Sequence, residues 1–302
     1  MPNKIISNID TSFIPTIIPK VKGRFALDRL QDEAFPMYTT IAKKGVDLII
    51  RGGHPFLITY PYLILNTQFR QRFKTLLELT NKRNFTLHAT MYAKGVSEEQ
   101  LYSALVSPNK LLPNNTNLYI TMCLYENSIE EMNFKNIVLL VKAFFGTENN
   151  PIMPNIIPAT YSEVNSKEKL KDMAEFLLQN TSETEGLLLL NKKGSYIQGE
   201  SALTKTNAVL LDPSEDIFGT IVKINSSTNF LPGETLTMAD ELLIKFGETE
   251  LTYSLSSLSL VIRGFLVEIK NKLIGSKILC NNLYFTNQNT PTIKKIKKIY
   301  YL

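Results

Sequence analysis

The chain has 302 residues, of which 44% are hydrophobic and 20% are charged, and its formal net charge is +5. This length allows two domains, and this composition is that of an ordinary folded, soluble protein. Apolar runs such as residues 137–141 fall far short of a membrane span. Residues 1–22 contain no continuous apolar segment of the kind found in signal peptides. We therefore expect an intracellular, cytoplasmic protein with no membrane partner.

The sequence offers few residues for metal or triad chemistry. His54 and His88 are the only histidines, which leaves little for a zinc site or a histidine-based triad. Cys123 and Cys280 lie far apart, each among apolar strand-like residues. We expect two buried thiols rather than a disulfide or a metal-binding pair.

Strand-like and helix-like segments alternate in the first two thirds of the chain. Strands are expected where short apolar runs lack helical spacing, at residues 20–27, 46–51, 85–92, 117–125, 187–190 and 208–211. Helices are expected at 67–81, 97–106, 136–145 and 167–179. Ser97 and Gln100 form a capping-box pattern, and Ser166 is a candidate N-cap. The run of leucines at 187–190, entered from Glu185, indicates a buried strand.

The pattern changes at Asp212–Glu215, which we interpret as a turn and a domain boundary. Beyond it we expect only short strands and no helix, at 218–224, 235–238, 242–246, 252–262, 265–269 and 277–285. Short strands at this spacing are typical of a small barrel, of which the oligonucleotide-binding (OB) barrel is one common form. The predicted domains are residues 1–213 and 214–302.

Positive charge gathers in the last fifty or so residues. Against the single acid Glu268, the segment 251–302 contains eight basic residues: Arg263, Lys270, Lys272, Lys277, Lys294, Lys295, Lys297 and Lys298. This excess favours a polyanion as partner, and the alternative is an ordinary solvated face. The nearby aromatic residues, which pack in a core or stack on nucleic-acid bases, are Tyr284, Phe285, Tyr300 and Tyr301.

Several short motifs follow one another in order along the chain. They are Lys20-x-x-Gly23, Arg51-x-Gly53-x-Pro55, Tyr92 with Gly95 and Ser97, Glu185-Gly186-Leu187-Leu188, and Tyr196-x-x-Gly199. In order and spacing they resemble the motifs of the ATP-dependent DNA ligases, which belong to the covalent nucleotidyltransferases. The Glu-Gly-Leu-Leu motif is the most specific of them, and the resemblance covers nearly the whole chain.

The resemblance implies an α+β fold, with a ligase-like nucleotidyltransferase domain of antiparallel sheets flanked by helices and a small C-terminal OB-type barrel. It implies Lys20 as the nucleophile that accepts AMP, and Lys20, Arg51 and Glu185 as nucleotide contacts. Glu185 is also the one matched candidate ligand for a metal. ATP and Mg²⁺ are the cofactors if the protein is active. Nucleic acid, DNA more than RNA, is the implied partner.

The chain departs from the family's motifs at positions that carry the chemistry. Lys22 stands where the family has an aspartate, Phe25 where it has an arginine, and Thr90 where it has a glutamate. Two lysines of the family's Lys-x-Lys motif fall on Leu210 and Asp212. Losing one preorganised group of this kind costs about a hundredfold to a thousandfold in rate. We therefore predict a degenerate ligase that is catalytically impaired or inactive, with no cofactor at all as one outcome.

Three functions remain open at this point. The first is a ligase-like protein that binds nicked or duplex DNA or serves as a structural component. The second is an active polynucleotide ligase that forms lysyl-AMP at Lys20, with other lysines replacing the lost cations; the candidates are Lys22, Lys192, Lys193 and Lys205. The third is a protein-interaction module that reuses the fold. In the simplest alternative for the site residues, Arg51 and Glu185 form an ordinary ion pair at the rim.

Overall fold

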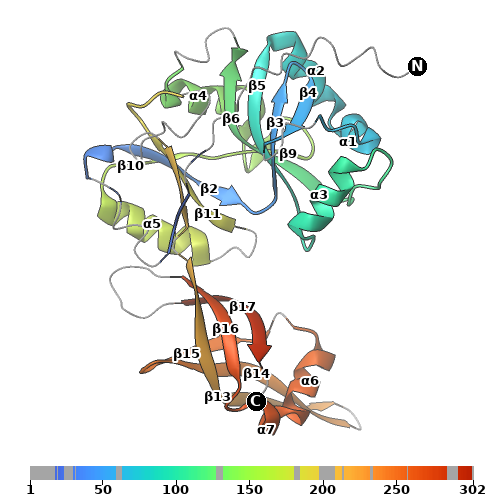
Figure 1. Cartoon of the computed structure of the whole chain (residues 1–302), viewed down its shortest axis with the longest axis vertical. Coiled ribbons are helices and arrows are strands. Elements are labelled where there is room, and N and C mark those ends of the chain that lie inside the picture. Colours follow the sequence, from blue (N-terminus) through green and yellow to red (C-terminus); the bar gives the residue numbers. More distant parts are fainter. Residues whose placement is uncertain are drawn as a thin grey trace. The chain divides into compact units, whose positions relative to one another are not determined.

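The computed structural model consists of two compact units (Figure 1). The structure describes residues 18, 20–23, 30, 32–58, 63–126, 132–179, 184–196, 208–212, 214–231, 234–256, 258–283 and 292–300. The first unit comprises Met1–Val21 and Asp28–Asp212, and the second comprises Lys22–Leu27 and Pro213–Leu302. We describe each unit by itself.

Sheet I of the first unit has five strands in the order β1–β12–β11–β2–β10. The strands are β1 (Lys20–Lys22), β2 (Met37–Lys43), β10 (Ser162–Val164), β11 (Thr184–Asn191) and β12 (Ala208–Asp212). Central β11 is antiparallel to both β12 and β2. All four leucines at 187–190 are buried, which confirms the predicted buried strand. Helix α5 (Lys167–Gln179) lies beside β10 and β11 (Figure 1).

Sheet II of the first unit has the order β4–β3–β5–β6–β9, and only its β6–β9 pair is parallel. The strands are β3 (Val46–Arg51), β4 (His54–Leu57), β5 (Phe85–Ala93), β6 (Thr116–Tyr125) and β9 (Ile156–Pro158). Helices α1 (Thr67–Arg72), α2 (Lys74–Arg83), α3 (Glu98–Val106) and α4 (Phe134–Phe145) belong to the same unit. A 3₁₀ turn at Asp32–Ala34 and the small pair β7 (Gly146–Thr147) and β8 (Asn150–Pro151) complete it.

The helix predicted over residues 67–81 is instead two helices that meet at Phe73. Asn66 caps α1, because its Oδ1 accepts a hydrogen bond of 2.8 Å from the Phe69 amide. At Phe73 the backbone leaves helical geometry (φ −105°, ψ 20°) before α2 begins. Phe69 and Phe73 both lie in the core, with their ring centroids 4.9 Å apart. The capping box predicted at Ser97 is confirmed, since both of its hydrogen bonds are formed.

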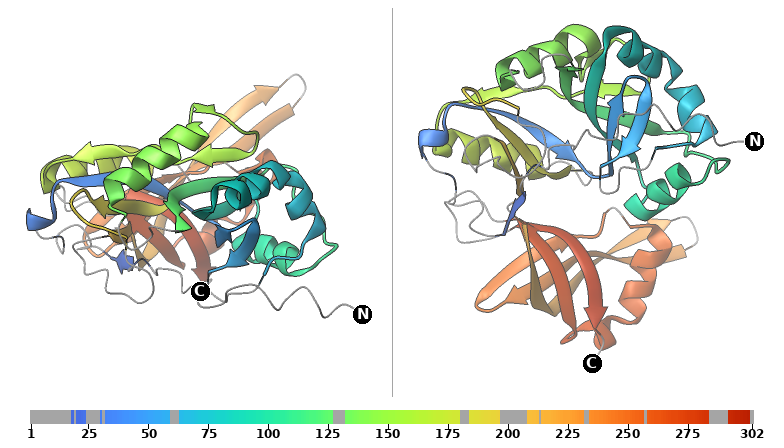
Figure 2. Two further views of the ribbon diagram at one scale, coloured as in Figure 1. Left: turned by 90° about the horizontal axis from the view of Figure 1, so that it is seen from above. Right: turned by 45° about the horizontal axis from the view of Figure 1, so that its top comes forward.

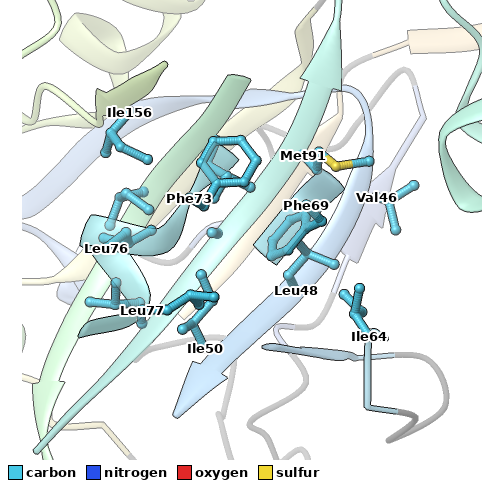
Figure 3. Close-up of a cluster of buried hydrophobic side chains, with 14 of the residues drawn as sticks. Val46, Leu48, Ile50, Ile64, Phe69, Phe73, Leu76, Leu77, Met91 and Ile156 are labelled. Carbon is cyan, nitrogen blue, oxygen red and sulfur yellow. The ribbon is translucent and has the colours of Figure 1, made fainter. Parts of the chain in front are cut away.

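Sheet II is buried on both faces. On one face, Leu48 and Ile50 of β3 pack in a core with Phe69 and Phe73 (Figure 3). The other face packs toward sheet I in a second core whose members come from β6, α4, β11 and β12; they include Met122, Leu124, Phe134, Ile137, Leu188, Leu190 and Ala208. The two sheets are therefore layers of one unit, and any cavity between them is lined by both.

The second unit is built on sheet III, with the order β15–β14–β13–β16–β17 and all pairs antiparallel. Its strands are β13 (Ser214–Leu231), β14 (Glu234–Phe246), β15 (Thr249–Ser254), β16 (Lys277–Leu283) and β17 (Thr292–Tyr300). β13 and β14 form a long hairpin (Figure 2). Within the described part of this unit, no strand pairing closes the sheet into a barrel.

Our expectation that the second unit contains no helix was wrong. Strand β15 ends at Ser254, and the chain then forms helices α6 (Leu260–Glu268) and α7 (Lys270–Leu273). Ser259 starts α6, because its hydroxyl accepts a hydrogen bond from the Ile262 amide. The β-branched residues around 260 favour strands by propensity. The N-cap and the packing of α6 against β14 stabilise a helix instead.

Both cysteines are free and buried, as predicted. Burial raises the pKa of the Cys280 thiol to about 12 and also raises the pKa of Cys123. Neither thiol is therefore reactive at neutral pH. In the described part of the chain, no helix is both long and apolar enough to cross a membrane.

Gly186 provides a test of the strand packing in sheet I. A Cβ at this position would lie 2.2 Å from the Leu211 carbonyl oxygen. We expect G186A to lower the free energy of unfolding of the first unit by about 1–3 kcal/mol, because one of two paired backbones must move. Hydrogen exchange, which reports each unit separately, measures the change.

The control is Gly264 in α6, where a Cβ would meet nothing within 4 Å. We expect G264A to stabilise its helix by about 0.5–1 kcal/mol. Equal, negligible effects of both substitutions on unfolding would contradict the close approach at Gly186.

Candidate functional site

Lys20 is held by two carboxylates in sheet I. Its Nζ donates a hydrogen bond to Glu185 Oε1 and lies 3.7 Å from Asp212 Oδ2. Burial alone lowers the pKa of Lys20, but the hydrogen bond to Glu185 and the charges of both carboxylates outweigh it and raise the pKa above its ordinary value. Lys20 is therefore firmly protonated at neutral pH.

The order of three neighbouring strands brings these residues together. Lys20 is in β1, Asp212 ends β12, and Glu185 is near the start of β11, which lies on the other side of β12. A register irregularity between Thr184 and Gly186 places Glu185 at a bulge. Its side chain can consequently reach across toward β1.

A cavity of about 160 Å³ opens between sheets I and II beside this cluster. It is lined from both sheets by Ile18, Ala42, Lys43, Asp47, Ile58, His88, Ala89, Thr90, Thr121, Glu185, Leu188 and Leu210. The carboxylates of Asp47 and Glu185 thus face a space whose other walls are largely apolar. Leu210 lies here, one of the two positions where the resemblance implies a lysine.

Asp47 and Thr90 form a second acidic position in the cavity wall. They are directly opposite one another on β3 and β5, and the Thr90 hydroxyl donates a hydrogen bond of 2.7 Å to Asp47 Oδ1. Asp47 remains accessible to solvent. Protein atoms around its carboxyl nevertheless raise its pKa to about 6 by desolvation, and the negative charges of Glu185 and Glu98 act in the same direction.

His88 enters the cavity wall as a neutral group. It is buried in β5, and its Nε2 lies 2.8 Å from the hydroxyl of Tyr196. Desolvation lowers the pKa of His88 to about 4, so the ring carries no charge at neutral pH. It contributes no positive charge to the cavity.

Lys43 is the cation in the cavity wall. Only 9% of its side chain is exposed, and its Nζ lies 3.8 Å from Glu148 Oε1. The same ammonium lies over the rings of Tyr92 and Tyr119, at 5.5 and 5.7 Å from their centroids. A buried lysine held by a carboxylate and two aromatic rings is largely fixed in place.

Arg51 and Glu185 do not pair with each other. Arg51 Nε donates hydrogen bonds of 2.8 and 2.7 Å to both carboxylate oxygens of Glu126, and Thr86 donates to the same carboxylate. Glu185 lines the cavity and pairs with Lys20, whereas Arg51 is not among the described residues that line it. The alternative in which Arg51 and Glu185 form an ion pair at the rim is therefore wrong.

Three of the four candidate replacement cations are absent from the described lining of the cavity: Lys22, Lys192 and Lys193. Lys192 pairs with Glu163, with its Nζ 2.8 Å from Oε2. Lys193 is exposed and Lys22 belongs to the second unit. The fourth candidate, Lys205, lies outside the described residues.

The basic residues of the second unit fall into two groups. Arg263 pairs with Asp240 and donates to the Ala239 carbonyl, and Lys297 pairs with Asp216. These two charges are compensated. Within segment 251–302, the described lysines that form no ion pair with a described residue are Lys270, Lys272, Lys277 and Lys298. Lys294 and Lys295 are in β17, and their side chains lie outside the description.

Sequence reasoning missed Asp47, Lys43 and His88 as cavity residues. A usable signal exists for Asp47, which is the single acid in the apolar segment Val46–Arg51. No comparable signal marks Lys43, because its position depends on how sheet I faces sheet II.

Several solved structures share this fold. The DNA ligase–adenylate of Chlorella virus superposes with a TM-score of 0.64 at 16% identity, over 94% of this chain and 98% of the ligase. The ATP-dependent DNA ligase of bacteriophage T7, in complex with ATP, has a TM-score of 0.51 at 14% identity, over 97% of this chain and 100% of the ligase. A scan against protein-family models found no match, and a search of curated proteins found none.

The chain has the fold of the ATP-dependent DNA ligases. This confirms the mixed α and β architecture that the motifs led us to expect. At 14–16% identity the likeness establishes the fold alone. Function must therefore be argued from the site.

The buried His88 predicts a pH dependence that can be isolated. Its pKa is about 4 in the folded state and 6.5 in its ordinary range, so the unfolded chain binds a proton that the folded state does not. The contribution of His88 to the free energy of unfolding is complete above about pH 6.5 and is lost as the pH falls toward about 4. The loss from this one group is about 3 kcal/mol.

Replacing His88 with Gln keeps a hydrogen-bonding partner for Tyr196 and removes the titration. We expect the loss of stability between neutral pH and about pH 4 to be smaller in H88Q than in the wild type. Urea unfolding at both pH values measures this, with H54Q, which changes the other histidine, as control. An unchanged pH dependence in H88Q would contradict the assignment.

Proposed function

We propose that this protein keeps the ligase fold, is impaired in adenylyl transfer, and acts by binding nucleic acid. The observation that carries the first part is the pairing of Lys20 with Glu185 and Asp212. In this proposal the second unit corresponds to the C-terminal OB-type domain of the ligases. Because the structural neighbours are DNA ligases, we expect DNA rather than RNA as the partner.

Adenylyl transfer needs an unprotonated lysine amine as nucleophile. An enzyme lowers the pKa of such a lysine with cationic neighbours or desolvation. Here the neighbours of Lys20 are carboxylates, and its pKa is shifted upward. By the resemblance, Asp212 stands where the family has a lysine, so a cation that would lower this pKa has become an anion that raises it.

The residues at the cavity fit a triphosphate with its metal poorly. Phosphates are bound by cations, but Lys20 is engaged by Glu185 and Lys43 by Glu148. The volume of about 160 Å³ is smaller than the roughly 300 Å³ at which ordinary ligand pockets begin. Across the described ranges, no group of three or more His, Cys, Asp or Glu residues could hold a metal ion. We derive no step through ATP or Mg²⁺.

Glu185, the matched candidate for a metal ligand, has a different partner. The ammonium of Lys20 lies against it and close to Asp212, in the place a cation would take between two carboxylates. The internal ion pair therefore competes with metal binding. This competition supports the proposal that the transfer reaction is impaired.

An adenylation assay tests the first part. With ATP labelled on its α-phosphate and Mg²⁺ or Mn²⁺, we expect the wild type to gain no more covalent label than K20A. The double substitution L210K/D212K restores the two cations implied by the family and removes one carboxylate from Lys20. We expect it to gain label by about a hundredfold or more, and to lose this gain when K20A is added.

Folding of each variant is checked by its unfolding transition, and D212K alone serves as the milder substitution. A wild-type label that K20A abolishes would overturn the proposal and favour an active ligase that forms lysyl-AMP at Lys20.

Positive charge on the second unit supports the nucleic-acid part. Lys270 and Lys272 lie on α7, and Lys277 and Lys298 lie on β16 and β17. Their charges are not cancelled by a described carboxylate, and phosphate contacts from such lysines give binding that does not depend on sequence. Arg263 contributes less, because Asp240 already compensates it.

Titration against nicked duplex and single strands at several salt concentrations tests this part. If four lysines contact phosphates, the logarithm of the affinity falls with the logarithm of the salt concentration, with a slope of about −3.6 on duplex and about −2.8 on single strands. We expect K270A/K272A to reduce this slope by nearly half. The control K74A changes an exposed lysine of α2 that pairs with Glu78, and should leave the slope unchanged.

Binding that is absent even at low salt would overturn this part. Together with a negative adenylation assay, that result would favour a protein-interaction module.

A further inference from the structure

The outer face of sheet III presents two aromatic rings beside lysines. Phe218 of β13 is 62% exposed and Tyr300 of β17 is 38% exposed. Their ring centroids lie 5.8 Å apart with the planes inclined at 52°. Single exposed apolar residues are common on folded surfaces, whereas adjacent ones form a patch that is a candidate binding site.

Strand register places lysines on the same face. Phe218 aligns through Leu279 with Lys298, and Thr220 aligns through Lys277 with Tyr300. The first set of aligned residues lies two positions from the second along each strand. The side chains of both sets therefore project from the same face of the sheet.

The opposite side of these strands is core. Ile278 of β16 is fully buried, and Ile299 of β17 packs against the same hydrophobic cluster. A side chain on Gly219 would collide with Ile244 and Phe246 on that inner side. The aromatic pair therefore belongs to the solvent face and is not needed to fill the core.

The ammonium groups lie close to the rings. Lys298 Nζ lies 4.8 Å from the Tyr300 ring centroid, and Lys277 Nζ donates a hydrogen bond of 3.1 Å to the Thr220 hydroxyl. Neither lysine has a described carboxylate partner. Lys297, in contrast, is paired with Asp216 at the next position of the same face, which bounds the positive patch.

We propose that Phe218 and Tyr300 form a stacking platform for the bases of single-stranded nucleic acid, with Lys277 and Lys298 binding the flanking phosphates. Aromatic rings beside lysines are the combination that single-strand binding requires, because every base has a π-face and every nucleotide a charge. In a duplex the bases are already stacked on each other and unavailable to these rings. This inference rests on the proposed nucleic-acid function. It adds where on the second unit the nucleic acid binds and that single strands bind there in preference to duplex.

Fluorescence anisotropy with oligothymidylate, oligouridylate and a nicked DNA duplex tests the platform, using the full chain. We expect F218A and Y300A each to weaken single-strand binding by about tenfold, and to leave duplex binding within about twofold. Y300F keeps the ring and should retain wild-type binding. Comparison of oligothymidylate with oligouridylate distinguishes DNA from RNA as the source of the strand.

A second readout uses the absence of tryptophan from the chain. F218W introduces a single indole on the platform, whose fluorescence should be quenched when single strands stack on it. F265W is the control, because Phe265 is 53% exposed on α6 of the same unit but lies on a helix outside the platform. We expect no quenching in F265W.

The outcomes separate the platform from the function on which it rests. If the wild type binds nucleic acid with salt dependence but F218A and Y300A bind single strands as well as it does, the platform is overturned and the proposed function stands. If the wild type binds neither single strands nor duplex, both are overturned. Quenching of F218W and F265W alike would also overturn the platform.

Discussion

The contact of one lysine with two carboxylates determines what the site can do. Asp212 is only 5% exposed, and a carboxylate with so little water needs a partner of opposite charge. Lys20 supplies that charge, and Glu185 shares the same ammonium. The interaction with Lys20 offsets the cost of burying the Asp212 carboxylate in sheet I. The same interaction keeps the Lys20 amine protonated. A protonated amine has no lone pair with which to act as a nucleophile.

The fold around the site is stabilised by apolar cores and by polar groups that pair with one another. The two cores of the first unit are formed by apolar residues of sheets I and II and their helices, such as Phe69 on one face and Leu188 on the other. His88 of sheet II lies within hydrogen-bond distance of Tyr196, and Arg51 pairs with Glu126. The same architecture can therefore carry different chemistry at the site.

The sequence predicts elements where local signals agree with the fold. The leucine run of β11 and the capping box of α3 are such cases, and the motif order correctly indicates the ligase fold. Other features depend on contacts that a sequence does not contain. The Phe73 break and α6 follow from packing and a local cap, and the approach of Lys20 to Asp212 follows from the order of β1, β12 and β11. Lys43 becomes a cavity residue only because two sheets face each other.

The second unit shows why counting charges along a chain does not describe the charge of a surface. Eight basic residues in sequence become, in the structure, compensated charges such as Arg263 and uncompensated ones such as Lys298. Phe218 precedes the basic segment by more than thirty residues and carries no sequence signal of binding. Antiparallel pairing of β13 with β16, and of β16 with β17, brings it beside Tyr300. A surface that combines aromatic rings with lysines is thus a property of strand register.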